Sequence, residues 1–293
     1  MPNRIKNKQM ESANTKQVKH LIELAIAEDL GDGDITTEAL IPYDQKGKAS
    51  IVAKAKGIIA GTEVSKQVFL TVDPKLKVHI LIHDGDAVKP GDVIAEIIGN
   101  HTSILKAERV ALNFLQRLSG IASETSNYVE AAKGLPVQIL DTRKTTPGLR
   151  ALEKYAVKAG GGKNHRMNLG DAILIKDNHL VALRRQGLTV KDIIARARQK
   201  APKNIRIEIE AKTPEEASEA ANAGADIIML DNMSLEEMQQ AVQLIKGRAL
   251  IEASGGVAID KVRAIAETGV DFISIGALTH SPKALDINLE LET

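Results

Sequence analysis

Basic side chains gather in one part of this sequence, between residues 141 and 179. The cluster consists of Arg143, Lys144, Arg150, Lys163, His165, Arg166 and Lys176, although the 293-residue chain has a net charge of only +1. Several of these residues flank loop-forming sequences, Pro147-Gly148 and the three glycines before Lys163. Cations in such loops at strand ends converge on an anion more often than cations along a helix face do. We therefore expect a small anionic ligand, because nucleic acid would need a broader basic surface.

Acidic side chains end two of the predicted strands. Between Ile205 and Glu210 the isoleucines share one face of the strand, and Glu208 and Glu210 share the other. Glutamates inside a barrel are costly unless they meet a cation. Asp231 ends the next predicted strand, so Glu210 and Asp231 form a candidate Mg²⁺ platform, since Mg²⁺ takes one or two carboxylates plus substrate oxygens. Salt bridges to the basic cluster explain the pair equally well, and both interpretations stay open.

Glycine loops follow two later predicted strands. Ser254-Gly255-Gly256 stands before a predicted helix, whose first N–H groups are suited to phosphate, and Gly276 closes the next strand. Paired phosphate loops after the last two strands recur in (β/α) barrels, although two ordinary βα turns remain an alternative. His165 is open to three roles: general base, hydrogen-bond donor to a ligand, or packed loop residue. The sequence lacks the spacings of zinc proteases, P-loops, Rossmann folds and nucleophile elbows.

The elements before Pro136 indicate a small α+β domain. After a polar tail at residues 1–17, we expect a helix over 18–30 and a short helix capped by Asp34 or Thr36. Alternating strands follow at 50–54, 77–82 and 92–97, broken by glycine turns. A long helix over 108–132 is too apolar for a one-sided stripe, which indicates burial on more than one side.

Beyond Pro136 the pattern changes to strands that alternate with helices. Strands are expected at 137–140, 172–175, 205–209, 226–230, 249–253 and 272–275. The helices between them include 214–223, 234–246 and 260–268. Repeated β–α units imply a parallel sheet, open or closed. Polar groups follow the ends of all six strands, which is where (β/α) barrels carry their active sites. We therefore expect a barrel, complete or incomplete.

Composition narrows the possible classes of function. The chain has no cysteine, which excludes disulfides, iron–sulfur clusters, thiolate zinc sites and a cysteine nucleophile. Aromatic residues make up only 2%, so a stacking platform for single-stranded nucleic acid is not expected. No apolar run approaches the roughly 18 residues of a membrane span, and the polar N-terminus has no apolar signal region. We expect a cytoplasmic protein with neither a nucleic-acid nor a membrane partner.

Several long strings of the sequence resemble the quinolinate phosphoribosyltransferase family, also called nicotinate-nucleotide pyrophosphorylase (carboxylating). In chain order they are EDLGDGDITT, ERVALNFLQRLSGIA, DTRKTTPG, GGGKNHRMNLGDAILIKDNH, IMLDN, EASGG and ISIGALTHS. The likeness extends from about Val18 to Leu289. It implies an N-terminal α/β sandwich domain, residues 18–118 joined by 281–293, and a C-terminal incomplete (β/α) barrel, residues 119–280. It also implies Mg²⁺ and a homodimer, or a hexamer built from dimers.

The reaction implied by the resemblance is transfer of phosphoribose from 5-phosphoribosyl 1-pyrophosphate (PRPP) to quinolinate with loss of CO₂, a step of NAD biosynthesis. By the family pattern, the quinolinate carboxylates are held by Arg143, Arg166 and, across a dimer interface, Arg109, helped by His165 and Lys176. Thr145 is expected as a further substrate-binding residue. The same pattern places the phosphates and ribose against Lys144, Lys176, Glu210, Asp231, Ser254, Gly255, Gly256 and Gly276. The groups expected to act in catalysis are Lys144, Lys176, Glu210 and Asp231, the last two as ligands of Mg²⁺.

Two rival functions stay open. One is phosphoribosyl transfer to a different aromatic acid, for which three arginines would be excessive if the acid carried a single carboxylate. The other is a non-catalytic phosphate-binding barrel, which would not need the acidic pair Glu210 and Asp231.

Overall fold

The computed structural model describes residues 16–202 and 204–292. The chain divides into two compact units. Among the described residues, the first unit contains 16–126, 145–161 and 278–292, and the second contains 127–144, 162–202 and 204–277. Within the described residues, no helix combines the length and the apolar character that a membrane crossing requires. The tail predicted at 1–17 lies outside the described residues, apart from Lys16 and Gln17, which open the first described helix.

The first unit is built on an antiparallel sheet of four strands in the order β12-β1-β5-β3. These strands are β1 (Lys46–Ala53), β3 (Lys77–Ile80), β5 (Val93–Asn100) and β12 (Ile287–Leu291). The last strand of the chain therefore pairs with the first strand of the sheet, with Ile51 opposite Leu289. A small two-stranded sheet of β2 (Gly57–Ile58) and β4 (Ala87–Val88) completes the strands of this unit.

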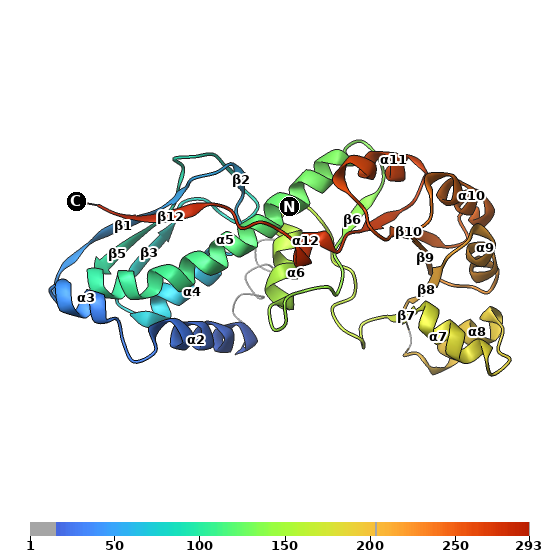
Figure 1. Cartoon of the computed structure of the whole chain (residues 1–293), viewed down its shortest axis with the longest axis horizontal. Coiled ribbons are helices and arrows are strands. Elements are labelled where there is room, and N and C mark those ends of the chain that lie inside the picture. The colour runs from blue at the N-terminus through green and yellow to red at the C-terminus, as the bar shows by residue number, and fades with distance from the viewer. Residues whose placement is uncertain (1–15, 203, 293) are drawn as a thin grey trace. The chain divides into compact units, whose positions relative to one another are not determined.

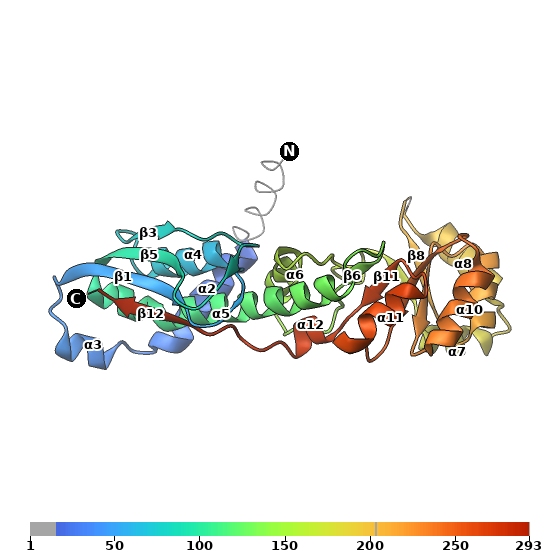
Figure 2. The same cartoon turned by 90° about the horizontal axis from the view of Figure 1, so that it is seen from above.

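Helices cover this sheet, and α5 runs along one of its faces (Figures 1 and 2). The helices of this unit are α2 (Lys16–Leu30), α3 (Ile35–Leu40), α4 (Thr62–Val72), α5 (His101–Ala131), α6 (Arg150–Ala159) and the short α12 (Ala277–His280), and the last two do not lie on the sheet. Asp34 is the N-cap of α3, because its carboxylate accepts the Thr37 N–H at 2.9 Å. The apolar residues of α5 are buried on several sides, including Ile104, Leu112 and Ile121. This matches the sequence expectation for a long helix without a single apolar stripe.

The second unit is built on six parallel strands in the order β6-β11-β10-β9-β8-β7. The strands are β6 (Gln138–Leu140), β7 (Ile173–Ile175), β8 (Ile207–Ala211), β9 (Ile227–Asp231), β10 (Leu250–Ser254) and β11 (Phe272–Ser274). Since β6 and β7 occupy opposite edges and do not pair, the sheet is a barrel left open between them. The strand pattern left open whether the barrel is complete, and the open sheet is the incomplete α/β barrel that the family resemblance implies.

Helices alternate with these strands and lie on the outside of the curved sheet (Figure 1). They are α7 (Asp177–Arg184), α8 (Val190–Lys200), α9 (Pro214–Asn222), α10 (Leu235–Ile245) and α11 (Val262–Glu267), the last preceded by a 3₁₀ turn at Ile259–Lys261. Three of them start at a hydroxyl N-cap, at Thr189, Thr213 and Ser234. Each cap satisfies a backbone N–H that the first turn leaves without a partner, so the helix starts are encoded locally.

Strand register determines which side chains share the inner face. Residues opposite one another in a sheet point to the same side. One inward row crosses five strands in register: Glu210, Met229, Glu252, Phe272 and Gln138. The next row, toward the carboxyl ends of the strands, contains two pairs in register: Asp231 with Ser254, and Ser274 with Leu140. The isoleucines of β8 face the other way and are buried, so the face assignment made from the sequence holds.

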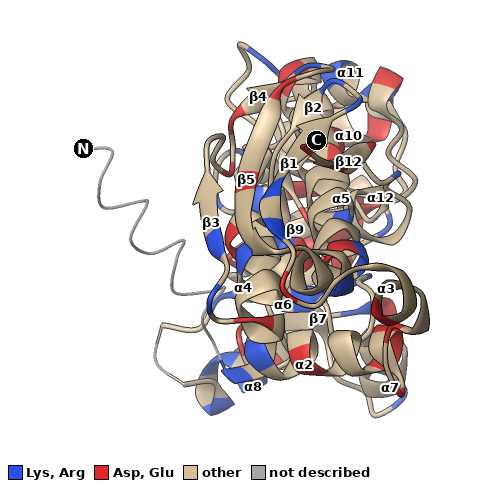
Figure 3. Cartoon of the chain, turned by 90° about the vertical axis from the view of Figure 1, so that its left-hand side faces the viewer, with Lys and Arg blue, Asp and Glu red and all other residues tan. Residues whose placement is uncertain are grey.

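Residues 145–161, which the sequence analysis places in the barrel domain, belong to the first unit by their contacts. The reason is α6, whose Glu153 is fully buried and pairs with Arg117 of α5 at 2.9 Å. A Cβ added at Gly160 would come 2.2 Å from the Ala122 carbonyl oxygen, so the end of α6 packs directly on the α5 backbone. Lys, Arg, Asp and Glu are interspersed in Figure 3, in line with the nearly neutral total charge.

Candidate active site

The acidic pair predicted from the sequence stands at the carboxyl ends of neighbouring strands. Glu210 lies opposite Met229, and Asp231 is two residues further along β9, so both carboxylates belong to the inner face. The Oε2 of Glu210 accepts the Asp177 N–H at 3.0 Å, and its Oε1 lies 3.9 Å from the Lys176 Nζ. Asp231 Oδ1 accepts from the Asn232 side-chain amide at 3.0 Å.

These two carboxylates fit the requirements of Mg²⁺. Each has lone pairs beyond the single hydrogen bond described, and each stands where a substrate could supply further oxygens. Mg²⁺ takes one or two protein carboxylates and keeps waters or phosphate oxygens for its other positions. The weak contact of Glu210 with Lys176 leaves the salt-bridge interpretation compatible with the same geometry.

The loop after β10 is shaped by one close contact. Gly255 has φ +104°, and a Cβ placed there would lie 2.2 Å from the Asn232 Oδ1. The Asn232 N–H donates to the Ser254 carbonyl at 2.9 Å, so the ends of β9 and β10 are joined here. Gly256, with φ +56°, would place a Cβ in open space. The helix predicted over 260–268 does not follow this loop directly. A 3₁₀ turn at Ile259–Lys261 comes first, and α11 begins at Val262.

Two guanidinium groups of the basic cluster lie near one another. Burial, followed by the charge of Arg143, lowers the pKa of Arg166. The Arg166 Nη1 donates to the Ala172 carbonyl at 3.1 Å. Among the described residues, the buried Nε of Arg143 has no hydrogen-bond partner. Two positive charges held close together, one of them with an unsatisfied donor, favour the binding of an anion. The two parallel N–H groups of a guanidinium match the geometry of a carboxylate.

The remaining predicted residues are placed as follows. Lys144 and Lys176 are exposed, and the Lys144 N–H donates to the Thr142 hydroxyl at 3.0 Å. Thr145 accepts from Arg150 Nε at 3.0 Å within the first unit. Gly276 follows β11 after one intervening residue, Ile275. Arg109 is an exposed residue of α5 in the first unit.

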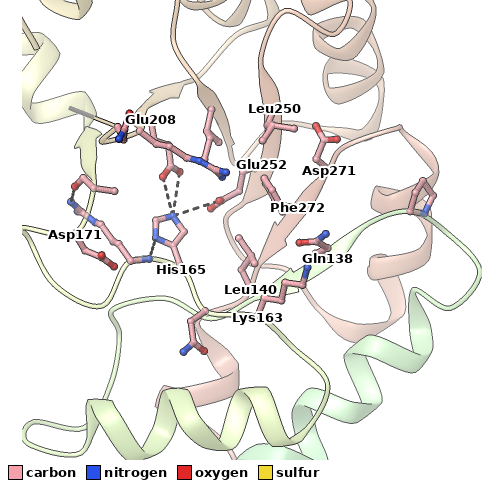
Figure 4. Close-up of a pocket in the computed structure, with 17 residues that line it drawn as sticks. Gln138, Leu140, Lys163, His165, Asp171, Glu208, Leu250, Glu252, Asp271 and Phe272 are labelled. Carbon is pink, nitrogen blue, oxygen red and sulfur yellow. Dashed lines mark hydrogen bonds and ion pairs between the residues drawn. The ribbon is translucent and has the colours of Figure 1, made fainter. Parts of the chain in front are cut away.

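His165 is the member of the cluster whose surroundings differ most from expectation. Its Nδ1 lies 2.7 Å from the Arg166 N–H, which donates to it. Its Nε2 lies 3.0 Å from Glu208 Oε2 and 3.5 Å from Glu252 Oε2. Figure 4 shows both carboxylates pointing at the imidazole ring. Both ring nitrogens are thus engaged by protein groups, and a direct contact with substrate stays a prediction.

These three side chains form a buried cluster inside the barrel. Burial and then the neighbouring Glu208 raise the pKa of Glu252 to about 7. Glu252 Oε1 accepts from the Ser274 hydroxyl at 2.6 Å. One ligand atom from each of His165, Glu208 and Glu252 lies within 4.8 Å of the others, a spacing that a divalent cation could also use. Sequence reasoning missed Glu252, although a lone glutamate within the apolar run Ala249–Ala253 was a usable signal.

The cluster borders a cavity of about 660 Å³ (Figure 4). Seven of the seventeen lining residues are the first residue of a strand or directly precede it: Gln138, Ala172, Arg206, Ile227, Leu250, Asp271 and Phe272. The cavity therefore lies inside the barrel and reaches the amino ends of the strands. Two candidate site residues, His165 and Arg166, line it, whereas Glu210, Asp231 and Ser254 do not. These last three stand toward the carboxyl ends of the strands, where barrels carry their chemistry.

Known proteins resemble this chain along most of its length. Residues 34–119 match the N-terminal domain of quinolinate phosphoribosyl transferase, and residues 121–290 match its C-terminal domain. A probable nicotinate-nucleotide pyrophosphorylase (carboxylating) of Bacillus subtilis is 43% identical, covering 95% of this chain and 94% of that protein. The chloroplastic nicotinate-nucleotide pyrophosphorylase of Arabidopsis thaliana is 44% identical over 95% of this chain and 84% of its own.

A solved structure gives the same result in three dimensions. The crystal structure of NadC from Streptococcus pyogenes superposes with a TM-score of 0.89 at 45% identity, covering 94% of this chain and 98% of that one. Both units of the fold, and the order of motifs along the chain, are thus accounted for. The chain belongs to the quinolinate phosphoribosyltransferase family.

Proposed function

We propose that this protein transfers phosphoribose from PRPP to quinolinate and releases pyrophosphate and CO₂, giving nicotinate mononucleotide. The observation that carries the substrate assignment is the pair Arg143 and Arg166, held close enough for one charge to lower the pKa of the other. A planar dicarboxylate offsets both charges at once. An acid with one carboxylate would leave a guanidinium group desolvated and unpaired, which is costly.

The chain contributes positioning and electrostatics to the reaction. The bond between C1 of the ribose and the pyrophosphate oxygen breaks, and the pyridine nitrogen forms a new bond to C1. Lys144 and Lys176 offset the charge that develops on the departing pyrophosphate, because fixed charges stabilise a transition state without reorganising. Arg143 and Arg166 hold the ring so that its nitrogen faces C1. The 5-phosphate lies against the N–H groups of the Ser254–Gly256 loop and Gly276.

Decarboxylation follows from the same geometry. The pyridine nitrogen becomes cationic when it bonds to C1, and the carboxylate on the adjacent carbon then leaves as CO₂. The electron pair stays on that carbon, stabilised by the neighbouring cation, and takes up a proton from solvent. We propose Mg²⁺ at Glu210 and Asp231, where it would offset charge on the PRPP oxygens.

We also propose a homodimer, or a hexamer built from dimers, in which Arg109 reaches the substrate of the partner subunit. Arg109 is exposed on α5 in a single chain, which leaves it available for such a contact. A cytoplasmic location is proposed from the sequence. Because some plant relatives carry mitochondrial or chloroplastic names, cell fractionation is the necessary test.

Pyrophosphate release measured with quinolinate, nicotinate and nicotinamide side by side tests the substrate assignment. We expect turnover of quinolinate, with nicotinate mononucleotide and CO₂ formed in equal amounts, and negligible turnover of the other two. Comparable rates with nicotinate would show that the arginine pair does not select a dicarboxylate.

A further inference from the structure

The open side of the barrel is bordered by a short segment, Lys163 to Arg166. Its backbone attaches to the free edge of β6, where Lys163 pairs with Leu140 as an isolated parallel bridge. The Lys163 N–H donates to the Ile139 carbonyl at 2.8 Å, and the Asp141 N–H donates to the Lys163 carbonyl at 3.1 Å. The fully buried carboxylate of Asp141 accepts the His165 N–H at 2.9 Å. The segment therefore extends the sheet by one residue at the edge where a further strand is missing.

The side chain of His165 connects this segment to strands β8 and β10 across the barrel interior. Only 11% of that side chain is exposed, and its Nε2 faces Glu208 on β8 and Glu252 on β10. Because Nδ1 accepts the Arg166 N–H, the ring proton belongs on Nε2, where it is donated to the carboxylates. The imidazole thus spans the interior from the β6 edge to β8 and β10.

We propose that Glu208 and Glu252 are positioning residues, which act through His165 to fix the Arg166 backbone so that its guanidinium group lies beside Arg143 for quinolinate. The proposal rests on the function proposed above. Neither glutamate touches substrate in it. They matter because Arg166 directly follows His165, so a shift of the imidazole moves the arginine.

We call the contact of His165 with Glu208 and Glu252 the brace. It is needed because the guanidinium groups of Arg143 and Arg166 repel each other. Without an anion between them, a loop free to move would separate them, and each binding event would have to restore the pair. Preorganisation removes that cost from the binding step. The burial of Glu208 and Glu252, at 3% and 1% exposed, is itself unfavourable and is retained only if the cluster contributes something that apolar residues cannot.

Four variants test the brace, two at each glutamate. Glu252→Gln keeps an oxygen acceptor for the His165 Nε2–H and a partner for the Ser274 hydroxyl, whereas Glu252→Leu removes both. The same contrast applies to Glu208→Gln and Glu208→Leu. Loss of one well-formed hydrogen bond corresponds to about a tenfold change in an equilibrium constant. We expect both leucine variants to raise the KM for quinolinate by about tenfold, with the KM for PRPP within about twofold of wild type, and both glutamine variants to stay near wild type.

The matched control is Asp226→Asn at the amino end of the neighbouring strand. Asp226 accepts the Ile207 N–H at 2.7 Å and pairs with Arg198 at 2.9 Å, so it supports β8 without facing the cluster. It should lower the melting temperature and leave the KM for quinolinate unchanged. A purely structural role of the glutamates would instead lower the melting temperature and change both KM values together.

If the leucine variants do not fold, NMR of the His165 ring in the wild type gives a second test. We expect a ring whose proton is on Nε2, the tautomer that can donate to Glu208 and Glu252. A proton found on Nδ1 instead could not be donated to the glutamates, and the brace proposal then fails. It fails equally if the glutamine variants lose quinolinate affinity as the leucine variants do. A chelator that lowers the melting temperature of the wild type but not of Glu252→Gln would show a metal site instead.

The two proposals fail separately. A wild-type protein that does not turn over quinolinate overturns the proposed function. Normal wild-type turnover together with an unchanged quinolinate KM in well-folded Glu208→Leu and Glu252→Leu overturns the brace alone.

Discussion

The Nη2 of Arg117 lies 2.9 Å from Oε1 of Glu153, a carboxylate whose side chain is fully buried. The other oxygen of Glu153 accepts the Thr146 N–H at 3.1 Å, and Arg117 also donates to the Thr279 carbonyl at 2.8 Å. This pair therefore joins α5, α6 and the chain that leads to β12.

Replacing Arg117 by methionine should lower the free energy of unfolding by about 3 kcal/mol, because it leaves a buried carboxylate without its counter-charge. Urea unfolding would measure the change. A second substitution, Glu153→Gln, should recover part of the loss by removing the stranded charge. Lys54→Met serves as the control, since its ion pair with Glu290 is exposed and should contribute less than about 1 kcal/mol. Equal losses in Arg117→Met and Lys54→Met would show that burial does not strengthen this pair.

Glu210→Gln and Asp231→Asn should each raise the Mg²⁺ concentration for half-maximal activity, by about tenfold or more, and raise the KM for PRPP. Quinolinate binding, measured by calorimetry without PRPP, should be unchanged. Glu267→Gln is the matched control, because Glu267 is exposed and pairs only with Arg263 at 3.1 Å among the contacts described. Wild-type Mg²⁺ dependence in both active-site variants would mean that the carboxylates are salt-bridge partners.

Gly255→Ala should raise the KM for PRPP and destabilise the protein, since the added Cβ meets the Asn232 side chain at 2.2 Å and the loop must move. Gly224→Ala separates this contact from backbone strain. Gly224 has φ +87° but nothing within 4 Å of an added Cβ, so only the cost of the left-handed conformation, about 1 kcal/mol, applies. Steady-state kinetics should show a PRPP effect at Gly255 alone. An equal rise in the KM for PRPP in Gly224→Ala would show that the rise in Gly255→Ala comes from lower global stability.

The raised pKa of Glu252, about 7 against an ordinary 4.5, makes stability depend on pH in a defined direction. Between these values the folded state binds a proton that the unfolded state has released. The contribution of this group is therefore present below pH 4.5 and is lost as pH rises toward 7, at up to about 1.4 kcal/mol per pH unit. Glu252→Gln, which mimics the protonated side chain, should reduce this loss of stability. Urea unfolding of the wild type and of Glu252→Gln at pH 5, 6 and 7 would measure the difference. If stability fell equally with pH in the two proteins, the raised pKa of Glu252 would be contradicted.

Arg109→Ala and Glu210→Ala homodimers should both fold and both be nearly inactive if Arg109 serves the partner subunit. Mixing them lets subunits exchange, and a mixed dimer then collects both lesions in one site and leaves the other intact. Equal random mixing should restore about a quarter of wild-type sites, since half of the dimers are mixed. Mass spectrometry of a labelled subunit would follow exchange. Confirmed exchange without recovered activity would place Arg109 in its own subunit's site or in none.

Local signals in the sequence were sufficient for the elements of the barrel. The strand predicted at 226–230 is β9 at Ile227–Asp231, and the helix predicted at 234–246 is α10, started by the Ser234 cap. Caps and alternating apolar runs depend on neighbours only a few residues away, so they can be read without tertiary information.

What the sequence could not supply depends on contacts between distant positions. His165 and Glu208 are 43 positions apart, and nothing local indicates that they meet inside the barrel. The assignment of α6 to the first unit depends likewise on the contact of Glu153 with Arg117, 36 positions away. The inward direction of Glu208 followed from strand alternation, but its partner did not, because alternation fixes a face and not a neighbour.

The pairing of β1 with β12 has a consequence for synthesis of the protein. Ser50 on β1 contacts Glu292, which is 242 positions further along the chain. While the ribosome makes the barrel strands, β1 has β5 on one side and an open edge on the other. Such an edge is a template for pairing with other chains, so the nascent protein is at its most aggregation-prone after the first unit has emerged and before its last strand arrives. Interrupted translation therefore leaves a fragment in which the edge of β1 lacks its partner strand.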